Sequence, residues 1–505
     1  RLIPIPSDKN KYMLVEELIL HFMPQIFSKY TIKSKSLIRI IRNADIDVDD
    51  AFYDEDLDYR NTMEKMIRER RKLCPVKMEY SRLDEKVIVT LCKELKLNKD
   101  QIYYSEAPLS MSFISQIRDK LHGKKDLFYV RRVPQNSRYV RSSLSMMEQI
   151  EAGDILLSYP FESMQPFIRL LNEAGENEKV VSIKMTLYRV AKNSQIVEAL
   201  INAAENGKEV VVLVELRARF DEENNIEWSR RLEDAGCRII YGIDHIKVHS
   251  KLCLITYCDG TEVKHITQIG TGNYNEQTAK LYTDLSLMTA NQDIAEEAAQ
   301  VFNRLCMAQV MEETHHLLVA PKCLQNRVLD FIEEEIHHAD NNEPAYIGVK
   351  MNSLTDKTII DKMVEASQHG VKIDLVVRGI CCLIPGIEGY TENIRVISIV
   401  GRYLEHSRIY IFGTPERDKM FISSADFMTR NMVKRVEVAT PIYDTAIKDR
   451  VRTMFGIMLH DTVKGRELCR DGNYYRREKP QEESEVISSQ AYFSNEAYLA
   501  ASKNV

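Results

Sequence analysis

The stretch KVHSKLCLITY at residues 247–257 decides the fold of this chain, because a second stretch of the same kind, LEHSRIYIFGT, occurs at residues 404–414. Each stretch places a histidine two residues before a basic side chain, at the start of an apolar run typical of a strand. A small-residue loop follows each run and leads to a carboxylate, Asp284 in the first case and Glu437 in the second. This shared order predicts a duplicated unit whose two histidines face each other across a pseudo-two-fold axis.

The repeated histidines carry the chemistry that we expect. Side chains two residues apart on a strand point the same way, so His249 shares a face with Lys251, and His406 shares one with Arg408. A neutral imidazole is a competent nucleophile toward phosphorus, and a fixed cation stabilises the charge on the transferred group. A single histidine on a strand is more simply a structural residue. Repetition in the same context favours phosphoryl transfer. The remaining helix-like histidines have no repeated partner, and we expect them to be solvated: His315, His316, His337 and His338.

The loop IGTGNYN at residues 269–275 could bind a phosphate. Its glycines allow backbone N–H groups to approach an anion closely, and Asn273 and Asn275 add donors. The alternative is an ordinary Gly-Asn turn. Farther along, Tyr282 and Asp284 either belong to the core and a cap, or pack a base and orient an imidazole. The sequence leaves both readings open.

Three arginines lie just beyond strand-like runs, where α/β folds place ligand-binding residues. They are Arg189, Arg219 and Arg378. A guanidinium there binds phosphate bidentately, whereas the structural alternative is an ion pair with a neighbouring acid such as Asp221 or Glu222. A second group of arginines could line a cationic passage, or could belong to a solvated linker: Arg131, Arg132, Arg138 and Arg141.

Composition narrows the class of protein. The 505 residues are 44% hydrophobic and carry a formal net charge of -6, which favours a globular chain and gives no overall basic field for nucleic acid. The ten cysteines show no CxxC spacing, so a reducing, cytoplasmic setting is expected. No signal-peptide pattern and no apolar run of membrane-spanning length occurs in the sequence.

The pattern of strands and helices predicts an α/β protein of three domains. An α/β head domain is expected at residues 1–135, followed by duplicated α/β domains at residues 136–316 and 317–505. Strands that alternate with helices favour mixed, mostly parallel sheets in both repeats. The last thirty or so residues are polar and mixed in charge, so we expect a frayed tail with at most one short helix.

Several strings are specific enough to identify a resemblance: YRVAKNS, ELRARFDEENNI, KVHSKL, IGTGNYNEQTAKLYTD, RYLEHSRIYIF and ISSADFMTRN. Through essentially its whole length the chain resembles polyphosphate kinase of the long, histidine-phosphorylating type, whose C-terminal halves are similar to the phospholipase D fold. The resemblance implies a magnesium-dependent, reversible transfer of the ATP γ-phosphate to inorganic polyphosphate through a phosphohistidine. It also implies a cytoplasmic homo-oligomer, a dimer or a tetramer, with ATP or ADP and polyphosphate as its partners.

The resemblance assigns roles to individual residues. His249 matches the phosphorylated nucleophile and His406 the second essential histidine, while Tyr282 and Arg378 match positions that contact ATP. Two further arginines, Arg189 and Arg219, match positions associated with magnesium. A guanidinium has no lone pair to give, so these arginines are expected to hold phosphates that carry the metal.

The chain also departs from the wider pattern. Phospholipase D relatives have an aspartate seven residues after each histidine, where this chain has Thr256 and Gly413, which argues against ordinary diesterase chemistry. The position of Asn273 is filled in the second repeat by Asp426, whose charge would repel phosphate unless it pairs with Arg430 or a metal. The family usually has a helical domain before the point where this chain begins. Two alternatives therefore stay open, a phospholipase D-like phosphodiesterase and a non-catalytic polyphosphate-binding module.

Overall fold

The structure is a computed structural model, and it divides the chain into two compact units, Arg1–Arg131 and Arg132–Val505. It describes residues 2–43, 64, 73–121, 125–216, 218, 221–243, 245–478, 480–482 and 485–502. Among these residues, every helix is too short or too polar to cross a bilayer. The predicted α/β class is confirmed, with mixed sheets and a duplicated C-terminal region.

The first unit is a small α/β structure. Antiparallel strands β3 and β4 pair with the parallel strand β5, and helix α3 begins at Asp84, whose side chain caps the N–H of Lys86. Few of its described side chains are fully buried, Met78 and Leu97 among them. Its elements are β1 (Leu2–Ile5), β2 (Asp8–Leu14), α1 (Val15–Ile26), β3 (Ile38–Arg42), β4 (Pro75–Tyr80), α3 (Glu85–Leu95), β5 (Ile102–Tyr104) and α4 (Ile114–Lys120).

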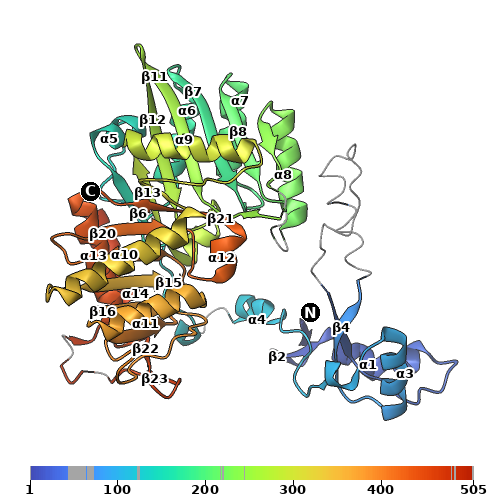
Figure 1. The fold of residues 1–505 in the computed structure, drawn as a ribbon. Helices are drawn as coiled ribbons and strands as arrows, with labels where there is room; N and C mark the ends of the chain where they lie inside the picture. Colours follow the sequence, from blue (N-terminus) through green and yellow to red (C-terminus); the bar gives the residue numbers. More distant parts are fainter. Residues whose placement is uncertain are drawn as a thin grey trace. The chain divides into compact units, whose positions relative to one another are not determined.

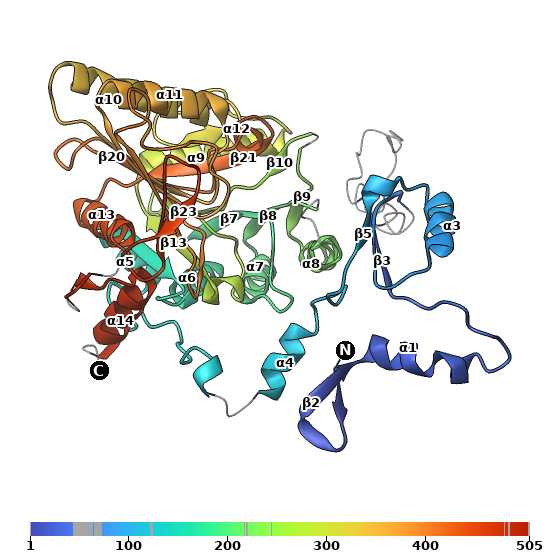
Figure 2. The ribbon, with the colours of Figure 1, turned by 90° about the horizontal axis from the view of Figure 1, so that it is seen from below.

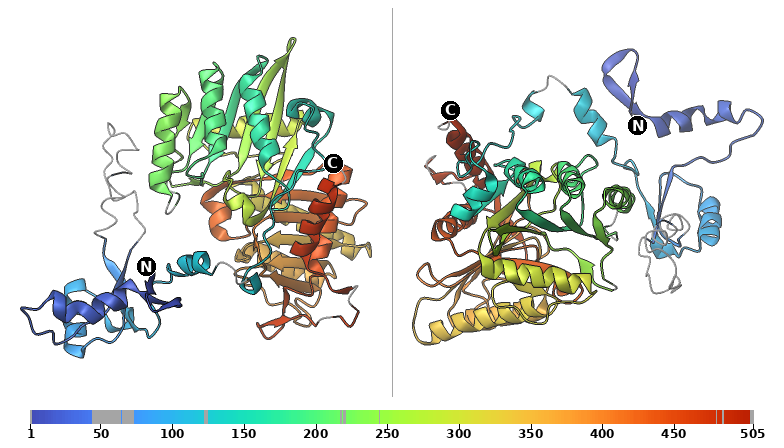
Figure 3. Two further views of the ribbon diagram at one scale, coloured as in Figure 1. Left: turned by 180° about the vertical axis from the view of Figure 1, so that it is seen from behind. Right: turned by 90° about the horizontal axis from the view of Figure 1, so that it is seen from above.

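The second unit begins with an eight-stranded sheet of order β18-β13-β12-β11-β7-β8-β9, with β6 beside β13. Figures 1 and 3 show α6, α7 and α8 on one face of this sheet and α9 on the other. The elements are α5 (Met146–Ala152), β6 (Ile155–Tyr159), α6 (Gln165–Glu176), β7 (Val180–Leu187), α7 (Gln195–Glu205), β8 (Glu209–Val214), α8 (Glu222–Asp234), β9 (Arg238–Ile240), β10 (Lys247–Val248), β11 (Leu252–Asp259), β12 (Glu262–Gly270), β13 (Tyr282–Thr289) and α9 (Gln292–Cys306).

The second half repeats this order around a ten-stranded sheet, β10-β21-β20-β19-β15-β16-β17-β22-β23, with β14 beside β21. Alternate residues of β16 belong to different cores: Leu375 and Val377 share one with residues of α10 and α11, and Val376 shares another with residues of α13. Figure 2 shows α10 and α11 side by side and α13 apart from them. The elements are β14 (Leu318–Ala320), α10 (Cys323–Asp340), β15 (Tyr346–Met351), α11 (Lys357–Gln368), β16 (Lys372–Val377), β17 (Ile394–Ile399), β18 (Leu404–Glu405), β19 (Arg408–Phe412), β20 (Lys419–Ser423), α12 (Thr429–Val433), β21 (Arg435–Pro441), α13 (Thr445–Leu459), β22 (Gly465–Leu468), β23 (Tyr474–Arg476) and α14 (Ser489–Ser502).

The expectation that parallel pairs would dominate these sheets is wrong. Antiparallel pairs outnumber parallel pairs among the described strands, and β11 and β12 form a hairpin whose two turn residues are Gly260 and Thr261. Gly260 has a φ of 65°, the left-handed conformation that a tight hairpin turn requires. Glycine at the first of the two turn positions in YCDGTEV is the sequence feature that suits this turn.

The expectation of a frayed C-terminal tail is also wrong. Helix α14 spans 14 residues and buries Phe493 and Ala497 in the core shared by the two halves. The ring of Phe493 lies 5.4 Å from that of Phe161, which in turn contacts Tyr403 from the second half. Figure 3 shows this last helix lying against the body of the second unit. Polar composition misled the prediction because Phe493 and Ala497 reach the core although the other buried residues of α14 are polar.

Candidate active site

Each half of the second unit gives a short strand to the sheet of the other half. Strand β10 pairs in parallel with β21, and strand β18 pairs in parallel with β13. The backbone N–H of His249 then donates to the carbonyl of Val436 at 2.9 Å, and that of His406 donates to Thr283 at 3.2 Å. This exchange fixes each histidine against the opposite half of the molecule.

The exchange also gives each histidine a carboxylate from the opposite half. His249 Nδ1 lies 2.9 Å from Glu437, and His406 Nδ1 lies 2.8 Å from Asp284. Both carboxylates are buried. Asp284 therefore orients an imidazole, one of the two roles that the sequence left open.

A hydroxyl from each small-residue loop completes these pairs. Thr271 Oγ1 donates to Asp284 at 2.6 Å, and Ser424 Oγ donates to Glu437 at 2.5 Å. Burial alone would raise the pKa of Glu437, but His249 and Lys251 hold it at about 2. Burial acts in the same way on Asp284, and His406 holds its pKa below the ordinary value. Both acids are therefore ionised at neutral pH.

Burial sets the charge of the imidazoles. It lowers the pKa of His249 to about 3, against the opposing attraction of Glu437, and it lowers the pKa of His406 as well. Both rings are thus neutral at pH 7. With a carboxylate at Nδ1, that nitrogen carries the proton and donates it, and the lone pair is left on Nε2.

The two Nε2 atoms have different surroundings. Nε2 of His249 makes no hydrogen bond to a described residue. In the other half, Nη1 of Arg408 lies 3.3 Å from both ring nitrogens of His406 and 2.9 Å from the carbonyl oxygen of the same residue. The free lone pair therefore belongs to the first histidine.

Arg408 is held by a buried ion pair with Asp426, at 3.2 Å from Nε and 3.1 Å from Nη2. Asn352 also donates to Asp426, through its backbone N–H at 2.7 Å and its amide at 3.0 Å. The sequence offered Arg430 as a side chain that could neutralise Asp426, but Arg408 on strand β19 takes this role. The charge of the Asp426 carboxylate is neutralised by the Arg408 guanidinium, so it does not repel phosphate.

Lys251 is buried beside His249 and donates to the carbonyl of His249. Burial lowers its pKa to about 7, and the charge of Glu437 opposes this shift only in part. His249 and Lys251 were predicted to share a strand face, but they lie in the connection between β10 and β11. The chain passes from one sheet to the other at this point, and both side chains still contact the ring of Tyr188.

Two of the three predicted arginines have structural partners. Arg189 follows β7 and forms an ion pair with Asp221 at 2.9 Å, as the structural alternative proposed. Arg378 follows β16, and its Nε donates to Asn352 at 2.8 Å and to the carbonyl of Glu405 at 2.6 Å. Arg219 lies outside the described residues. Of the arginines suggested for a polymer passage, Arg138 lies 3.5 Å from Glu496 on α14.

The loop after β12 is only partly available to an anion. The N–H of Gly270 donates to the carbonyl of Lys251. Gly272 is required by a close approach, because a Cβ there would lie 2.2 Å from Asp284 Oδ2. The amide oxygen of Asn273 is buried and has no hydrogen-bond partner among the described residues.

Sequence reasoning missed Arg435. It begins β21 two residues before Glu437, as Tyr282 begins β13 two residues before Asp284. Arg435 Nη1 lies 3.6 Å from Glu437, and the Tyr282 ring lies 5.3 Å from the His406 ring. Aligning the two repeats would have revealed Arg435, since Arg435 and Tyr282 both stand two residues before the repeated carboxylate.

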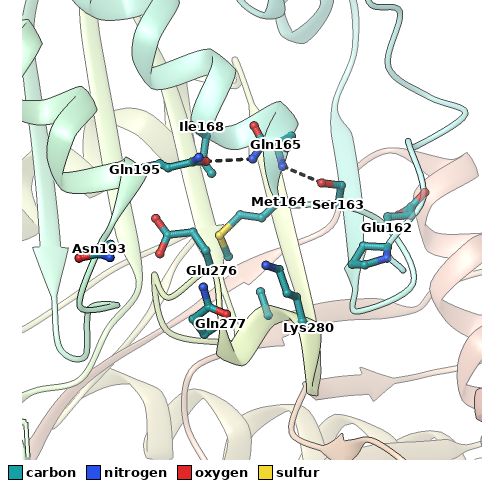
Figure 4. A pocket seen from close by; sticks show the side chains of 12 residues that line it. Glu162, Ser163, Met164, Gln165, Ile168, Asn193, Gln195, Glu276, Gln277 and Lys280 are labelled. Carbon is teal, nitrogen blue, oxygen red and sulfur yellow. Dashed lines mark hydrogen bonds between the residues drawn. The ribbon is translucent and has the colours of Figure 1, made fainter. Parts of the chain in front are cut away.

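A cavity of about 160 Å³ is lined by residues at the start of α7, such as Gln195, and by residues that precede β13, such as Glu276 and Lys280 (Figure 4). Glu276 joins these two segments, because its carboxylate accepts from Ser194 Oγ at 2.9 Å and from the N–H of Ile196 at 3.2 Å. Figure 4 also shows the amide of Gln165 bonded to Gln195. The cavity is lined by Pro134, Glu162, Ser163, Met164, Gln165, Ile168, Asn193, Gln195, Glu276, Gln277, Ala279 and Lys280.

Three family models match the chain. The polyphosphate kinase middle domain matches residues 1–117, C-terminal domain 1 matches residues 145–311, and C-terminal domain 2 matches residues 317–490.

Individual relatives agree with these matches. The chain is 43% identical to the polyphosphate kinase of Bacillus cereus over 480 residues, covering 94% of this chain and 68% of the relative. It is 43% identical to that of Staphylococcus epidermidis over 494 residues, covering 97% and 66%. The crystal structure of polyphosphate kinase from Porphyromonas gingivalis superposes with a TM-score of 0.83 at 31% identity, covering all of this chain and 74% of the other. The chain thus spans about two thirds of the length of the two sequence relatives.

Proposed function

The chain belongs to the polyphosphate kinase family, and on this premise we propose that it transfers the terminal phosphate of ATP reversibly to inorganic polyphosphate through a phosphohistidine at His249. One observation carries the proposal. The imidazole of His249 is buried and neutral, its Nδ1 is held by Glu437, and its Nε2 is not hydrogen-bonded to any described residue.

In the first step, Nε2 of His249 attacks the γ-phosphorus in line, and the bond to the bridging oxygen of ADP breaks. Positive charge develops on the imidazole as the N–P bond forms. The carboxylate of Glu437, which accepts the Nδ1–H, stabilises this positive charge. The aspartate of a Ser-His-Asp triad stabilises its protonated histidine in the same way. The step needs no proton transfer, because ADP leaves as an anion.

Cations around His249 neutralise the oxygens of the transferred group. Lys251 and Arg435 lie nearest, since both stand beside Glu437, the partner of His249. Arg189, just after β7, and Arg378, just after β16, supply charge to the nucleotide phosphates, and Tyr282 faces the base. His406, with its ring fixed by Asp284, stands near the leaving or entering oxygen.

In the second step, a terminal oxygen of polyphosphate attacks the phosphorus of the phosphoenzyme. The N–P bond breaks, and its electron pair returns to His249. A phosphoramidate and a phosphoanhydride have comparable transfer potential, so the reaction runs in both directions.

Magnesium enters as part of the Mg–ATP substrate, carried by its phosphate oxygens. The residues present fit this role, because the guanidinium of Arg189 has no lone pair for a metal but can hold the phosphates that carry it. The predictions of a homo-oligomer and of a cytoplasmic location stay predictions.

The test is label transfer from γ-labelled ATP. The intact chain should acquire an acid-labile, alkali-stable label, and His249→Gln should acquire none. His337→Gln, on the exposed end of α10, is the matched control and should label normally. Label on another side chain would overturn the proposal. Release of product from a generic phosphate diester would favour a phosphodiesterase, and polyphosphate binding without any label would favour a non-catalytic module.

A further inference from the structure

Tyr188 forms the aromatic wall of the site on the side of the first histidine. It is the first residue after β7, and its ring centroid lies 4.6 Å from that of His249 at an interplanar angle of 81°. Lys251 Nζ lies 5.4 Å from the same centroid, and the guanidinium carbon of Arg189 lies 5.6 Å from it. One ring thus contacts the imidazole and two cations.

The backbone at Tyr188 is fixed by helix α8. Asn225 Nδ2 donates to the carbonyl of Tyr188 at 2.8 Å and to that of Glu215 at 3.1 Å, so one buried amide joins the ends of β7 and β8. The neighbouring Asn224 donates to Val190 at 3.0 Å. The ring therefore projects from a rigid strand end, and its hydroxyl makes no hydrogen bond to a described residue.

The second half has no ring at this place. Asn352 is the first residue after β15, and it uses its side chain to bind Asp426 and Arg378. The aromatic wall therefore distinguishes the half whose Nε2 is free from the half whose imidazole faces Arg408.

We propose that Tyr188 is a positioning residue, whose ring holds the His249 imidazole at the angle of in-line attack and keeps water from the phosphohistidine. Glu437 fixes the imidazole at Nδ1 only, and a ring held at one atom can still swing about that bond. The edge-to-face contact with Tyr188 provides a second restraint, which stops the imidazole from rotating. The proposal rests on the proposed function of His249.

Two fates compete for the phosphoenzyme. In transfer, a polyphosphate oxygen forms the new P–O bond, the N–P bond breaks, and its electron pair returns to the imidazole. In hydrolysis, water forms that P–O bond, the same N–P bond breaks, and both protons of the water stay on the dihydrogen phosphate released. The Tyr188 ring covers one side of the imidazole, and removing the ring lets water reach that side. The ratio of hydrolysis to transfer therefore rises.

The partition of labelled phosphoenzyme tests this role. The chain is labelled with γ-labelled ATP, freed of nucleotide, and mixed with polyphosphate, and the label is followed into polyphosphate and into inorganic phosphate. Tyr188→Leu should label at least about 10-fold more slowly and should raise the ratio of hydrolysis to transfer by about 10-fold or more. Tyr188→Phe should keep both quantities within about 2-fold of the parent chain, because the hydroxyl has no role.

A matched control removes the same kind of contact outside the site. Tyr443 lies edge-on to His316, with ring centroids 6.1 Å apart. Tyr443→Leu should leave the partition unchanged. The proposal is overturned if Tyr188→Leu partitions like the parent chain, or if Tyr188→Phe shows the same defect as Tyr188→Leu.

A second measurement does not depend on ATP. Diethyl pyrocarbonate modifies accessible neutral imidazoles, and mass spectrometry of the peptide that contains His249 reports its rate. Tyr188→Leu should raise this rate several-fold, on the order of 5-fold, and Tyr188→Phe should not. An unchanged rate overturns the role of Tyr188. A parent chain that never labels at His249 overturns the proposed function instead, and the two failures are thereby distinguished.

Discussion

His249 and Glu437 are 188 residues apart in the sequence, and Nδ1 of the one lies 2.9 Å from the carboxylate of the other. The corresponding pair, His406 and Asp284, is 122 residues apart in the sequence, and His406 Nδ1 lies 2.8 Å from Asp284 Oδ1. In each pair the acid comes from the opposite half of the duplicated region. The site is therefore a property of both halves together.

Replacing Glu437 with glutamine should slow phosphorylation of His249 by on the order of 100-fold or more, because a neutral amide cannot stabilise the charge that develops on the imidazole. Rapid-quench measurement of label incorporation checks this. Glu297→Gln is the control, since Glu297 is a buried carboxylate that accepts from the backbone of residues 315–317 outside the site. An unchanged rate in Glu437→Gln would exclude the role given to this acid.

The pH dependence of kcat/KM for Mg–ATP should show a falling limb near pH 7 and no rising limb near pH 6.5. Burial lowers the pKa of Lys251 to about 7, so its charge is present below that pH and lost above it. Burial lowers the pKa of His249 to about 3, so its ring stays neutral across pH 5 to 9. Lys251→Arg keeps the charge and should abolish the falling limb. The equivalent position in the other half is Arg408, which indicates that an arginine fits such a place.

Asp426→Asn should destabilise the second unit by about 3–5 kcal/mol, because it leaves the buried guanidinium of Arg408 without its counter-ion. Denaturant unfolding measures this change. Asp361→Asn breaks an ion pair of solvent-exposed side chains with Lys357 and should change stability little. Equal effects in the two variants would contradict the assignment of Asp426 as the anchor of Arg408.

Gly272→Ala should impair the site through Asp284. The added Cβ would lie 2.2 Å from Oδ2 and must displace the carboxylate that orients His406. We expect a loss of about 1–3 kcal/mol of stability, seen in thermal melting, and a fall in transfer activity. Gly456→Ala in α13 meets no atom within 4 Å and should be neutral or stabilising. A fully active Gly272→Ala would show that the position of Asp284 does not matter.

The repeated sequence strings alone were enough to predict the histidines, the basic residues and the acids of the site. The predicted site residues lie together where the two halves meet: His249, Lys251, His406, Arg408 and the two repeated acids. The pairing between them was beyond the sequence, because β10 and β18 are two-residue strands whose partners lie in the opposite half. Periodicity reports a local conformation, and these contacts are not local.

The errors have the same physical origin. For Asp426 the sequence offered Arg430, four residues away, as a possible counter-ion, but the carboxylate binds Arg408 across neighbouring strands. The polar tail was expected to fray, but the few apolar residues of α14 find a shared core that composition does not reveal. In both cases a tertiary contact decided the outcome.

The exchange of β10 and β18 has a consequence for either half taken by itself. A single half in isolation would keep its imidazole and lose the acid that holds it, so it could offer no oriented nucleophile. Two identical copies meeting face to face would restore both pairs at once. With both halves in one chain the two places need not be alike, and Tyr188 and Asn352 are not.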